Sequence, residues 1–389
     1  MNSLPVPDQK LNKWLLQIRR HLHRHPELSG EEHQTCRYII SKLQELGIAS
    51  RRVHQTGVLA AIGDPAATGS DVALRADLDA LPIEEETGLA FASRVPGVMH
   101  ACGHDGHVAM LLGAAALLRN RRPLPGRVVL IFQPAEEGEG GAEGMIAAGA
   151  LTGVKAIFAG HIDRHLATGQ IAVQAGTICA STDEFTIVVR GRGGHAAKPH
   201  ETTDSIVIAA SLAVNLQSLV ARNCDPVQPA VLTIGQIQGG TAANVIAEET
   251  RLTGTIRAIL PQTRQTLLAG LRRMVKAAAL AHGATVDLSI TEGCPPLHND
   301  PVASDLARRV AEELLGREQV PGLPSPSLGG EDFARYLQQV PGCMVRFGAG
   351  KKRGPKGPAH SSRFDFDEKV LPIGARFLAQ TALTATEEL

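Results

Sequence analysis

The segment MHACGHDGHVAM, residues 99–110, contains three histidines and a cysteine between His100 and His107. Cys102 and His104 are two residues apart, so their side chains point to the same side of an extended segment. His104 and His107 are three residues apart and would share one face of a helix. Thiolate and imidazole groups bind zinc-like metal ions, but the same residues also suit a polar loop. Deciding between these interpretations requires partners from elsewhere in the chain.

The composition describes a folded protein without a preference for anionic partners. The chain has 389 residues, 43% of them hydrophobic and 20% charged, which favours two domains over one. Its 39 Lys and Arg balance 39 Asp and Glu, so no positive field favours nucleic acid or anionic membranes. We find no apolar run of the ~18 residues that a membrane span needs, and no secretory signal pattern. The scattered cysteines suit a reducing compartment, so we expect a cytoplasmic enzyme.

Helical and strand-like patterns alternate in the N-terminal part of the chain. Short apolar runs occur at residues 57–63, 71–77, 127–134 and 154–161. This alternation indicates a mainly parallel sheet covered by helices. From about residue 181 the order becomes strand, helix, two strands, helix and strand, which is typical of a ferredoxin-like unit. We therefore expect an α/β catalytic domain of residues 1–180 and 291–389, with an inserted ferredoxin-like α+β domain at residues 181–290.

Residues with metal-binding side chains follow several of the predicted strands or precede a predicted helix. In open α/β sheets, ligands gather beyond the carboxyl ends of the strands. Five candidates for metal binding stand at such positions: Cys102, His104, Glu137, His161 and His360. Five exceed what one tetrahedral ion with an open position needs, which suggests two divalent ions such as zinc, manganese or nickel. Consecutive extended residues face opposite ways, so of Glu136 and Glu137 one can bind metal while the other acts as general base.

Motifs across nearly the whole chain resemble one enzyme family. They include HRHPELSGEE, RADLDALPIEEETG, MHACGHDGHVAMLLGAA, QPAEEGEGGAEGM, GRGGHAAKPH, GGTAANVI, GTIRA and FDFDEKVLPIGA, in this order. The family is that of the dinuclear-metal amidohydrolases, which includes auxin-conjugate hydrolases, hippurate hydrolases and N-acyl-amino-acid deacetylases. It is related to aminoacylase and carboxypeptidase G.

The resemblance implies a role for each matching residue. It makes the five candidates above the ligands of two metal ions, and it makes Glu136 the general base. It places His195 and Asn244 on the inserted domain, from which they would reach the site, and suggests Arg257 for a substrate carboxylate. The implied reaction cleaves the amide bond of an N-acyl amino acid, giving a carboxylic acid and a free amino acid. With the exposed sheet edges of such a domain, it also implies a homodimer joined through residues 181–290.

Other residues of these motifs suit supporting roles. Asp77 and Asp79 could bind metal, but Arg75 replaces a ligand histidine of more distant relatives, so we expect both carboxylates to support the ligands. Asp105 is expected to cap the helix predicted at residues 106–119.

One departure from the family motifs bears on the substrate. Relatives usually show His-x-x-Pro after the ligand histidine, whereas this chain has Arg164 at the proline position. Further cations precede His360, namely Lys351, Lys352, Arg353 and Lys356. These charges suggest a substrate with more than one carboxylate, such as an N-acyl aspartate or glutamate, although a solvated loop explains them too.

Two other functions remain open from the sequence. A dipeptidase or carboxypeptidase would use the same site, because it differs only in a free amine on the acyl group. A non-catalytic binding protein on the same scaffold is the second alternative. The presence of Glu136 argues against it, because a binding protein needs the ligands but not the base.

Overall fold

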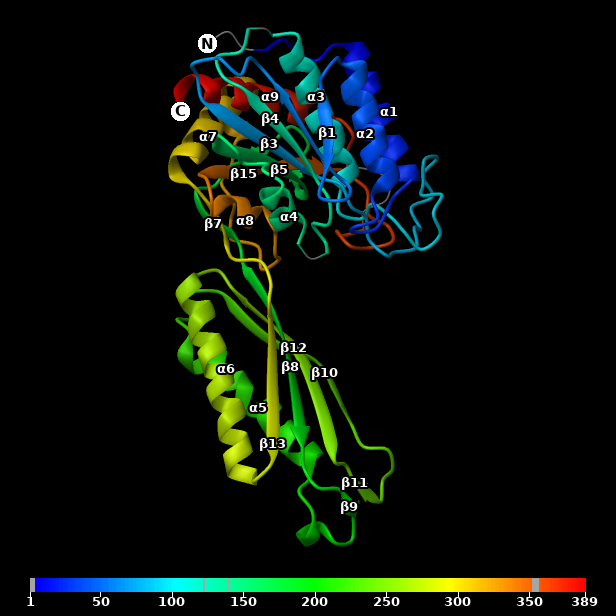
Figure 1. Ribbon diagram of the computed structural model, residues 1–389, viewed down its shortest axis with the longest axis vertical. Helices are drawn as coiled ribbons and strands as arrows, with labels where there is room; N and C mark the ends of the chain where they lie inside the picture. The colour runs from blue at the N-terminus through cyan, green and yellow to red at the C-terminus, as the bar shows by residue number, and fades with distance from the viewer. Residues whose placement is uncertain (1–3, 122, 139, 352–356) are drawn as a thin grey trace. The chain divides into compact units, whose positions relative to one another are not determined.

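The computed structural model describes residues 4–121, 123–138, 140–351 and 357–389 (Figure 1). The chain divides into two compact units, which we describe separately. The larger unit consists of the chain up to Gly176, with Asn299–Pro324 and Arg335–Leu389, and the smaller unit of Thr177–His298 and Ser325–Ala334. The second segment belongs to the smaller unit because the Ser327 backbone exchanges hydrogen bonds with residues 178 and 180. The function of residues 181–290 as a lid and dimerisation domain stays a prediction.

The larger unit is built on a seven-stranded mixed sheet. In spatial order its strands are β1 (Ser50–Val53), β2 (Gly57–Ile62), β4 (Val128–Gln133), β3 (Asp71–Asp77), β5 (Val154–Ala167), β15 (Gly342–Gly350) and β6 (Ile171–Ala172). The neighbouring strands β4, β3, β5 and β15 run parallel. Antiparallel pairs flank them, with β2 and β1 beyond β4 and β6 beyond β15. These central strands are almost entirely apolar and buried, as a sheet covered by helices requires. The predicted mainly parallel α/β architecture is confirmed.

One buried helix forms the centre of the core and carries part of the site. The helices of the larger unit are α1 (Gln9–Arg24), α2 (His33–Glu45), α3 (His104–Arg119), α4 (Gly141–Ala147), α7 (Pro301–Leu315) and α9 (Val370–Glu388), with a 3-10 turn at Arg317–Gln319. The short helix α8 (Phe333–Leu337) includes residues of both units. Helix α3 is buried on every face except at Arg119, and it packs against α1, α9 and β3. A Cβ atom on Gly106 would lie 2.7 Å from both Ile162 Cδ1 and Phe366 Cζ. This glycine therefore lets the first turn of α3 approach β5.

The smaller unit has the predicted ferredoxin-like order. Its four-stranded antiparallel sheet runs β10 (Ala230–Gly239), β12 (Glu249–Ala258), β8 (Ser181–Arg190) and β13 (Thr285–Glu292). Helices α5 (Ser205–Asn223) and α6 (Pro261–His282) lie along one face of this sheet (Figure 1). The short elements are β7 (Gly176–Cys179), β9 (Gly194–His195), β11 (Val245–Ile246), β14 (Leu297–Asn299) and a 3-10 turn at Pro199–Glu201; β9 pairs with β11 and β7 with β14.

Among the described residues, helix α5 is the one segment long and apolar enough to cross a membrane. It has 19 residues and contains an 18-residue window with a mean hydropathy of 1.5, so the expectation that no apolar run reaches this length was wrong. One such helix is weak support for a membrane span, because core helices meet the same criterion. The apolar residues on one face of α5 are buried in the core of the smaller unit: Ile208, Leu212, Leu216 and Leu219.

Candidate active site

The first pair of candidate ligands lies at the start of α3. Gly103 is the residue before the helix and has φ of 108°, a backbone conformation that glycine adopts without strain. This left-handed turn separates Cys102 from His104, which is the first helical residue. We expected this helix to begin two residues later, with Asp105 as its cap. Asp105 instead lies within the first turn, where no side chain caps the helix, and it bonds to other buried groups.

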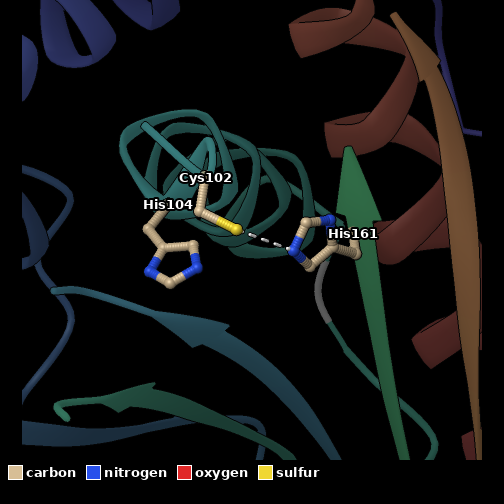
Figure 2. A group of neighbouring side chains, drawn as sticks. All are labelled: Cys102, His104 and His161. Atoms are coloured by element: carbon tan, nitrogen blue, oxygen red, sulfur yellow. Dashed lines mark hydrogen bonds between the residues drawn. The ribbon is translucent and has the colours of Figure 1, made fainter. Parts of the chain in front are cut away.

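Cys102, His104 and His161 form a compact group (Figure 2). Their ligand atoms all lie within 4.8 Å of one another, and Cys102 Sγ is 3.4 Å from His161 Nε2. His161 was expected at the end of a strand, but β5 continues to Ala167 and pairs His161 with Arg346 of β15. The pairing of β5 with β3 ends at Ala159, so His161 still lies beyond the carboxyl end of that shared ladder.

The surroundings of His104 leave one ring nitrogen available. Its Nδ1 lies 2.9 Å from the Asp79 carbonyl oxygen, to which it can donate. Its Nε2 is buried and has no hydrogen-bond partner among the described residues. An unpaired buried polar atom is costly, so its position next to Cys102 and His161 fits a metal ligand. Burial alone would lower the pKa of His104, but Asp77 and Cys102 raise it well above the usual value in the metal-free protein.

A second group shares Cys102 with the first. Cys102, Glu137 and His360 again have ligand atoms within 4.8 Å of one another. His360 Nε2 lies 3.1 Å from Glu137 Oε1, and the His360 backbone N–H donates to the Ala101 carbonyl at 2.9 Å. Contacts with Cys102 and then Glu137 raise the pKa of His360 to about 10, against the opposing effect of partial burial. All five predicted ligand residues are therefore brought together, in two groups that overlap at one thiol.

The two adjacent glutamates lie on a bent backbone. We expected Glu136 and Glu137 to face opposite ways on an extended segment, but that reasoning was wrong. Ala135 has φ of 52°, in the left-handed region, and residues 136–138 form bends. Carboxylate oxygens of both glutamates consequently lie within 4.8 Å of each other and of a ring nitrogen of His104. Glu136 Oε2 is 3.9 Å from His104 Nε2. A ligand bound next to His104 Nε2 would therefore be within reach of both carboxylates.

Asp79 aligns two of the candidate ligands at once. Its Oδ2 accepts hydrogen bonds from Ser29 Oγ at 2.6 Å and from the Glu137 backbone N–H at 2.9 Å. Its backbone carbonyl accepts from His104 Nδ1. Burial raises the pKa of Asp79, but the bonds from His104 outweigh this effect and the pKa is lowered. These contacts support the expected structural role of Asp79.

A buried ionic cluster underlies the first turn of α3. Arg19 of α1 is fully buried and donates to Asp105 at 3.0 Å, to Asp365 at 2.8 Å and to Glu368 at 3.1 Å. Lys351 also pairs with Asp365. Sequence reasoning missed this cluster. The only available signal was a charged residue, Arg19, on the apolar face of an amphipathic helix.

His23 adds a titratable group to this cluster. Its Nδ1 lies 2.8 Å from Asp105 Oδ2 and its Nε2 lies 3.4 Å from Glu85 Oε1. Burial lowers the pKa of His23, but the two carboxylates more than compensate and the pKa is raised. The pKa values of Glu85 and Asp105 are lowered in return, so the two carboxylates favour the protonated form of the ring.

We expect the stability contributed by His23 to depend on pH. Because its folded-state pKa is raised, the contribution is fully present below the unfolded value of about 6.5 and is lost as pH rises through the folded value. Wild-type protein should therefore lose stability relative to His23→Gln as the pH rises from about 6.5 into the alkaline range. Urea unfolding of both proteins, followed by the fluorescence of the single tryptophan, measures this difference. A constant difference across that range would show that His23 is neutral in the folded protein.

The candidates in the smaller unit occupy two separate places. His195 is exposed in β9 and pairs with Val245 of β11, while the Asn244 carbonyl accepts from the Ala196 N–H at 3.1 Å. Arg257 lies near the other end of β12, where its Nη1 donates to the Leu328 carbonyl at 3.2 Å. Residues 249 to 257 of an extended strand span roughly 26 Å at about 3.3 Å per residue. His195 and Arg257 of one smaller unit therefore do not contact the same small molecule.

The predicted basic cluster is only partly described. Lys352, Arg353 and Lys356 lie outside the described residues, and Lys351 is paired with Asp365. Arg164 lies over the Phe364 ring, with Cζ 5.7 Å from the ring centroid. Its Nε is buried and has no hydrogen-bond partner among the described residues. Burial lowers the pKa of Arg164, with only a partial opposing effect from Asp365.

The fold and the clustered thiol, imidazole and carboxylate groups are those of a hydrolytic enzyme on an α/β scaffold. The chain belongs to peptidase family M20/M25/M40, whose model matches residues 73–384. It is 40% identical to N-acetylcysteine deacetylase of Bacillus subtilis, over 99% of this chain and 100% of that protein. It is 40% identical to thermostable carboxypeptidase 1 of Saccharolobus solfataricus, over 94% of both chains.

A solved structure agrees with this assignment. The YXEP protein of Bacillus subtilis, described as a dinuclear metal binding peptidase from the M20 family, superimposes with a TM-score of 0.86. It is 36% identical, and the match covers 98% of this chain and 100% of that one. The family resemblance of the sequence motifs is thereby confirmed.

Proposed function

We propose that the protein is a metal-dependent amidohydrolase that cleaves the amide bond of an N-acyl amino acid. The observation that carries this proposal is the position of Glu136, whose carboxylate lies beside the ligand atoms of His104 and Glu137. Two similar proteins are named N-acetylcysteine deacetylase and IAA-amino acid hydrolase. A binding protein would need the ligand set but would not need a second carboxylate at this place.

The residues present fit two divalent ions. Cys102, His104 and His161 would hold one ion, and Cys102, Glu137 and His360 would hold the other. Thiolate, imidazole and carboxylate together suit zinc, manganese or nickel. When bound, such ions polarise a carbonyl oxygen and lower the pKa of water.

The protein's own groups then perform the proton transfers. Glu136 accepts a proton from the attacking water and delivers it to the nitrogen of the leaving amino acid, as general acid–base catalysis requires. His195, with Asn244 beside it, is suited to donate a hydrogen bond to the oxygen that becomes negative in the transition state. Arg257 is the candidate partner for the substrate carboxylate. Because it is too far from His195 of the same smaller unit, the His195 that reaches this substrate would belong to a second copy of the chain.

A substrate panel tests this function. Purified, metal-loaded protein should hydrolyse N-acetyl and longer N-acyl amino acids with release of the free amino acid, which is measured by amine detection. The carboxypeptidase relatives support a second candidate, cleavage of dipeptides that carry a free amine. Faster hydrolysis of dipeptides than of their N-acetylated counterparts would establish peptidase activity in place of deacylation. No turnover of either class would contradict both.

Arg164 provides a test of substrate charge. Its unpaired buried Nε could be satisfied by a second carboxylate on the substrate. We expect kcat/KM for N-acyl aspartate to exceed that for N-acyl alanine at low ionic strength, and Arg164→Ala to reduce the difference. An acidic substrate without any advantage in the wild type would show that Arg164 only packs against Phe364.

We further propose a homodimer joined through the smaller unit. Strand β10 is an edge of its sheet, and apolar side chains on α5 are exposed, Val207 by 58% and Val214 by 73%. Light scattering should give the mass of a dimer, and Val214→Glu should shift the equilibrium towards the monomer. Val227→Glu, at an 83% exposed site outside the helix, is the matched control and should remain dimeric. A wild-type monomer with full activity would contradict the proposal.

A further inference from the structure

A chain of buried hydrogen bonds links four elements beneath the candidate metal site. Arg75 Nε donates to Gln133 Oε1 at 2.8 Å, and Arg75 Nη1 donates to Asp77 Oδ2 at 2.7 Å. His107 Nδ1 lies 2.6 Å from the other oxygen of Asp77, and the Ile162 backbone N–H donates to His107 Nε2 at 2.9 Å. The chain thus runs from β4 through β3 and α3 to β5. The side chains of Arg75, Asp77 and His107 are at most 2% exposed.

The donors and acceptors of this chain permit one arrangement of protons. A backbone N–H can only donate, so His107 Nε2 must accept and its proton must be on Nδ1. That proton is then donated to Asp77, whose other oxygen accepts from the arginine. Both ring nitrogens of His107 are therefore engaged, Nδ1 as a donor and Nε2 as an acceptor.

This arrangement argues against a metal ion at a third group of residues. Asp77, His104 and His107 also have ligand atoms within 4.8 Å of one another, and all three are buried. An ion there would have to displace either the Ile162 N–H from Nε2 or the Asp77 contact from Nδ1. His107 thus serves the backbone of β5 and not an ion.

The backbone of Ile162 connects His107 to a candidate ligand. Its N–H is held by His107, and its carbonyl oxygen lies 2.8 Å from Nδ1 of His161, the preceding residue. With Nδ1–H donated to that carbonyl, the lone pair of His161 is on Nε2, the atom that faces Cys102 Sγ. The Ile162 side chain is also confined, because its Cδ1 packs against the positions of Gly103 and Gly106.

We propose that His107 is a positioning residue: held by Asp77 and Arg75, it fixes the Ile162 peptide and so directs His161 Nε2 towards the metal bound with Cys102. This inference rests on the proposed metal site at Cys102, His104 and His161. It assigns His107 no contact with metal or substrate.

The test compares two replacements of His107 with a matched control. In His107→Gln the side-chain amide can still accept from the Ile162 N–H and donate to Asp77, whereas His107→Leu can do neither. His100→Leu removes another fully buried histidine of the same segment, one whose ring nitrogens have no hydrogen-bond partner among the described residues. Apo-protein is titrated with Zn²⁺ and with Mn²⁺ in competition with a chromophoric chelator, which gives the affinity of each equivalent. The same titration of His161→Ala shows which of the two bound metal equivalents depends on His161 as a ligand.

We expect His107→Leu to weaken that same equivalent by about 10–100-fold, the usual effect of losing a group that orients a metal ligand. His107→Gln and His100→Leu should bind both equivalents like the wild type. If His107→Leu does not fold, His107→Asn is the second variant, since its shorter amide cannot span both partners and should also weaken the equivalent. Wild-type affinity in His107→Leu or His107→Asn, or equal losses in His107→Gln and His100→Leu, would overturn the inference. Failure of the wild type to bind two equivalents would instead contradict the proposed metal site.

Discussion

Glu136→Gln is expected to abolish turnover with the metal content unchanged, whereas Glu137→Gln is expected to lose metal. The two residues are adjacent, and the same chemical change is made in each, so the pair is its own control. Glutamine at 136 keeps the shape of the side chain but cannot carry a proton from water to the leaving nitrogen. Losing that transfer typically costs about 10²–10⁴ in rate. Glutamine at 137 removes a charged oxygen from the group with Cys102 and His360.

The measurement is elemental analysis of each purified variant beside a rate assay on one N-acyl amino acid. Both variants should retain the wild-type melting behaviour in the metal-free state, because neither glutamate is part of the apolar core. If Glu136→Gln lost metal while Glu137→Gln kept both ions, the assignment would be inverted. If both kept metal and activity, neither residue would have its proposed role.

Arg19→Met should destabilise the larger unit by about 3–5 kcal/mol, the usual cost of leaving buried charges without their partner. Arg19 has a side-chain exposure of 0% and pairs with Asp105, Asp365 and Glu368. Methionine keeps most of the packing between the rings of Phe91 and Phe366 but satisfies none of the three carboxylates.

Arg20→Met is the matched control for this prediction. Arg20 is the next residue of α1 and pairs with the same Glu368, but its side chain is 42% exposed. An exposed ion pair typically contributes 0–1 kcal/mol, so this variant should cost about 1 kcal/mol or less. Urea unfolding followed by the fluorescence of Trp14, which lies in α1, reports on this region. Equal losses in the free energy of unfolding of the two variants would show that the burial of Arg19 adds nothing to the stability that its ion pairs contribute.

The sequence predicted the α/β scaffold well because its apolar runs are local signals. The runs at residues 57–63, 71–77 and 127–134 became β2, β3 and β4 within one residue at each end. The candidate ligands were found for a related reason, since Glu137 follows a parallel strand and Cys102 and His104 stand at the start of a helix. His161 was found although its strand continues to Ala167. The order of elements in the smaller unit was also readable, because strand and helix patterns alternate clearly there.

The features that were missed depend on contacts between distant residues or on the backbone. Arg19 bonds to a residue 86 positions away and to another 346 positions away, and no local pattern reports such pairs. The expected orientation of Glu136 and Glu137 was wrong because the residue before them, Ala135, has a left-handed backbone conformation. Glycine would have signalled such a conformation in the sequence, but alanine does not. The partner of His107 was missed because it is a backbone N–H, which carries no side-chain signal.

The central position of α3 has a consequence for the synthesis of the protein. Its apolar residues pack against α9 closely enough that a Cβ on Gly374 would lie 1.9 Å from Met110 Sδ. Helix α9, like the strand β15 and His360, lies far C-terminal to α3 in the chain and is therefore synthesised well after it. Until then a nascent chain exposes one side of a helix that is buried in the finished protein, a surface prone to aggregation and to capture by chaperones. Assembly of the ligand set must likewise wait for His360, so metal can be acquired in full only after that residue has been synthesised.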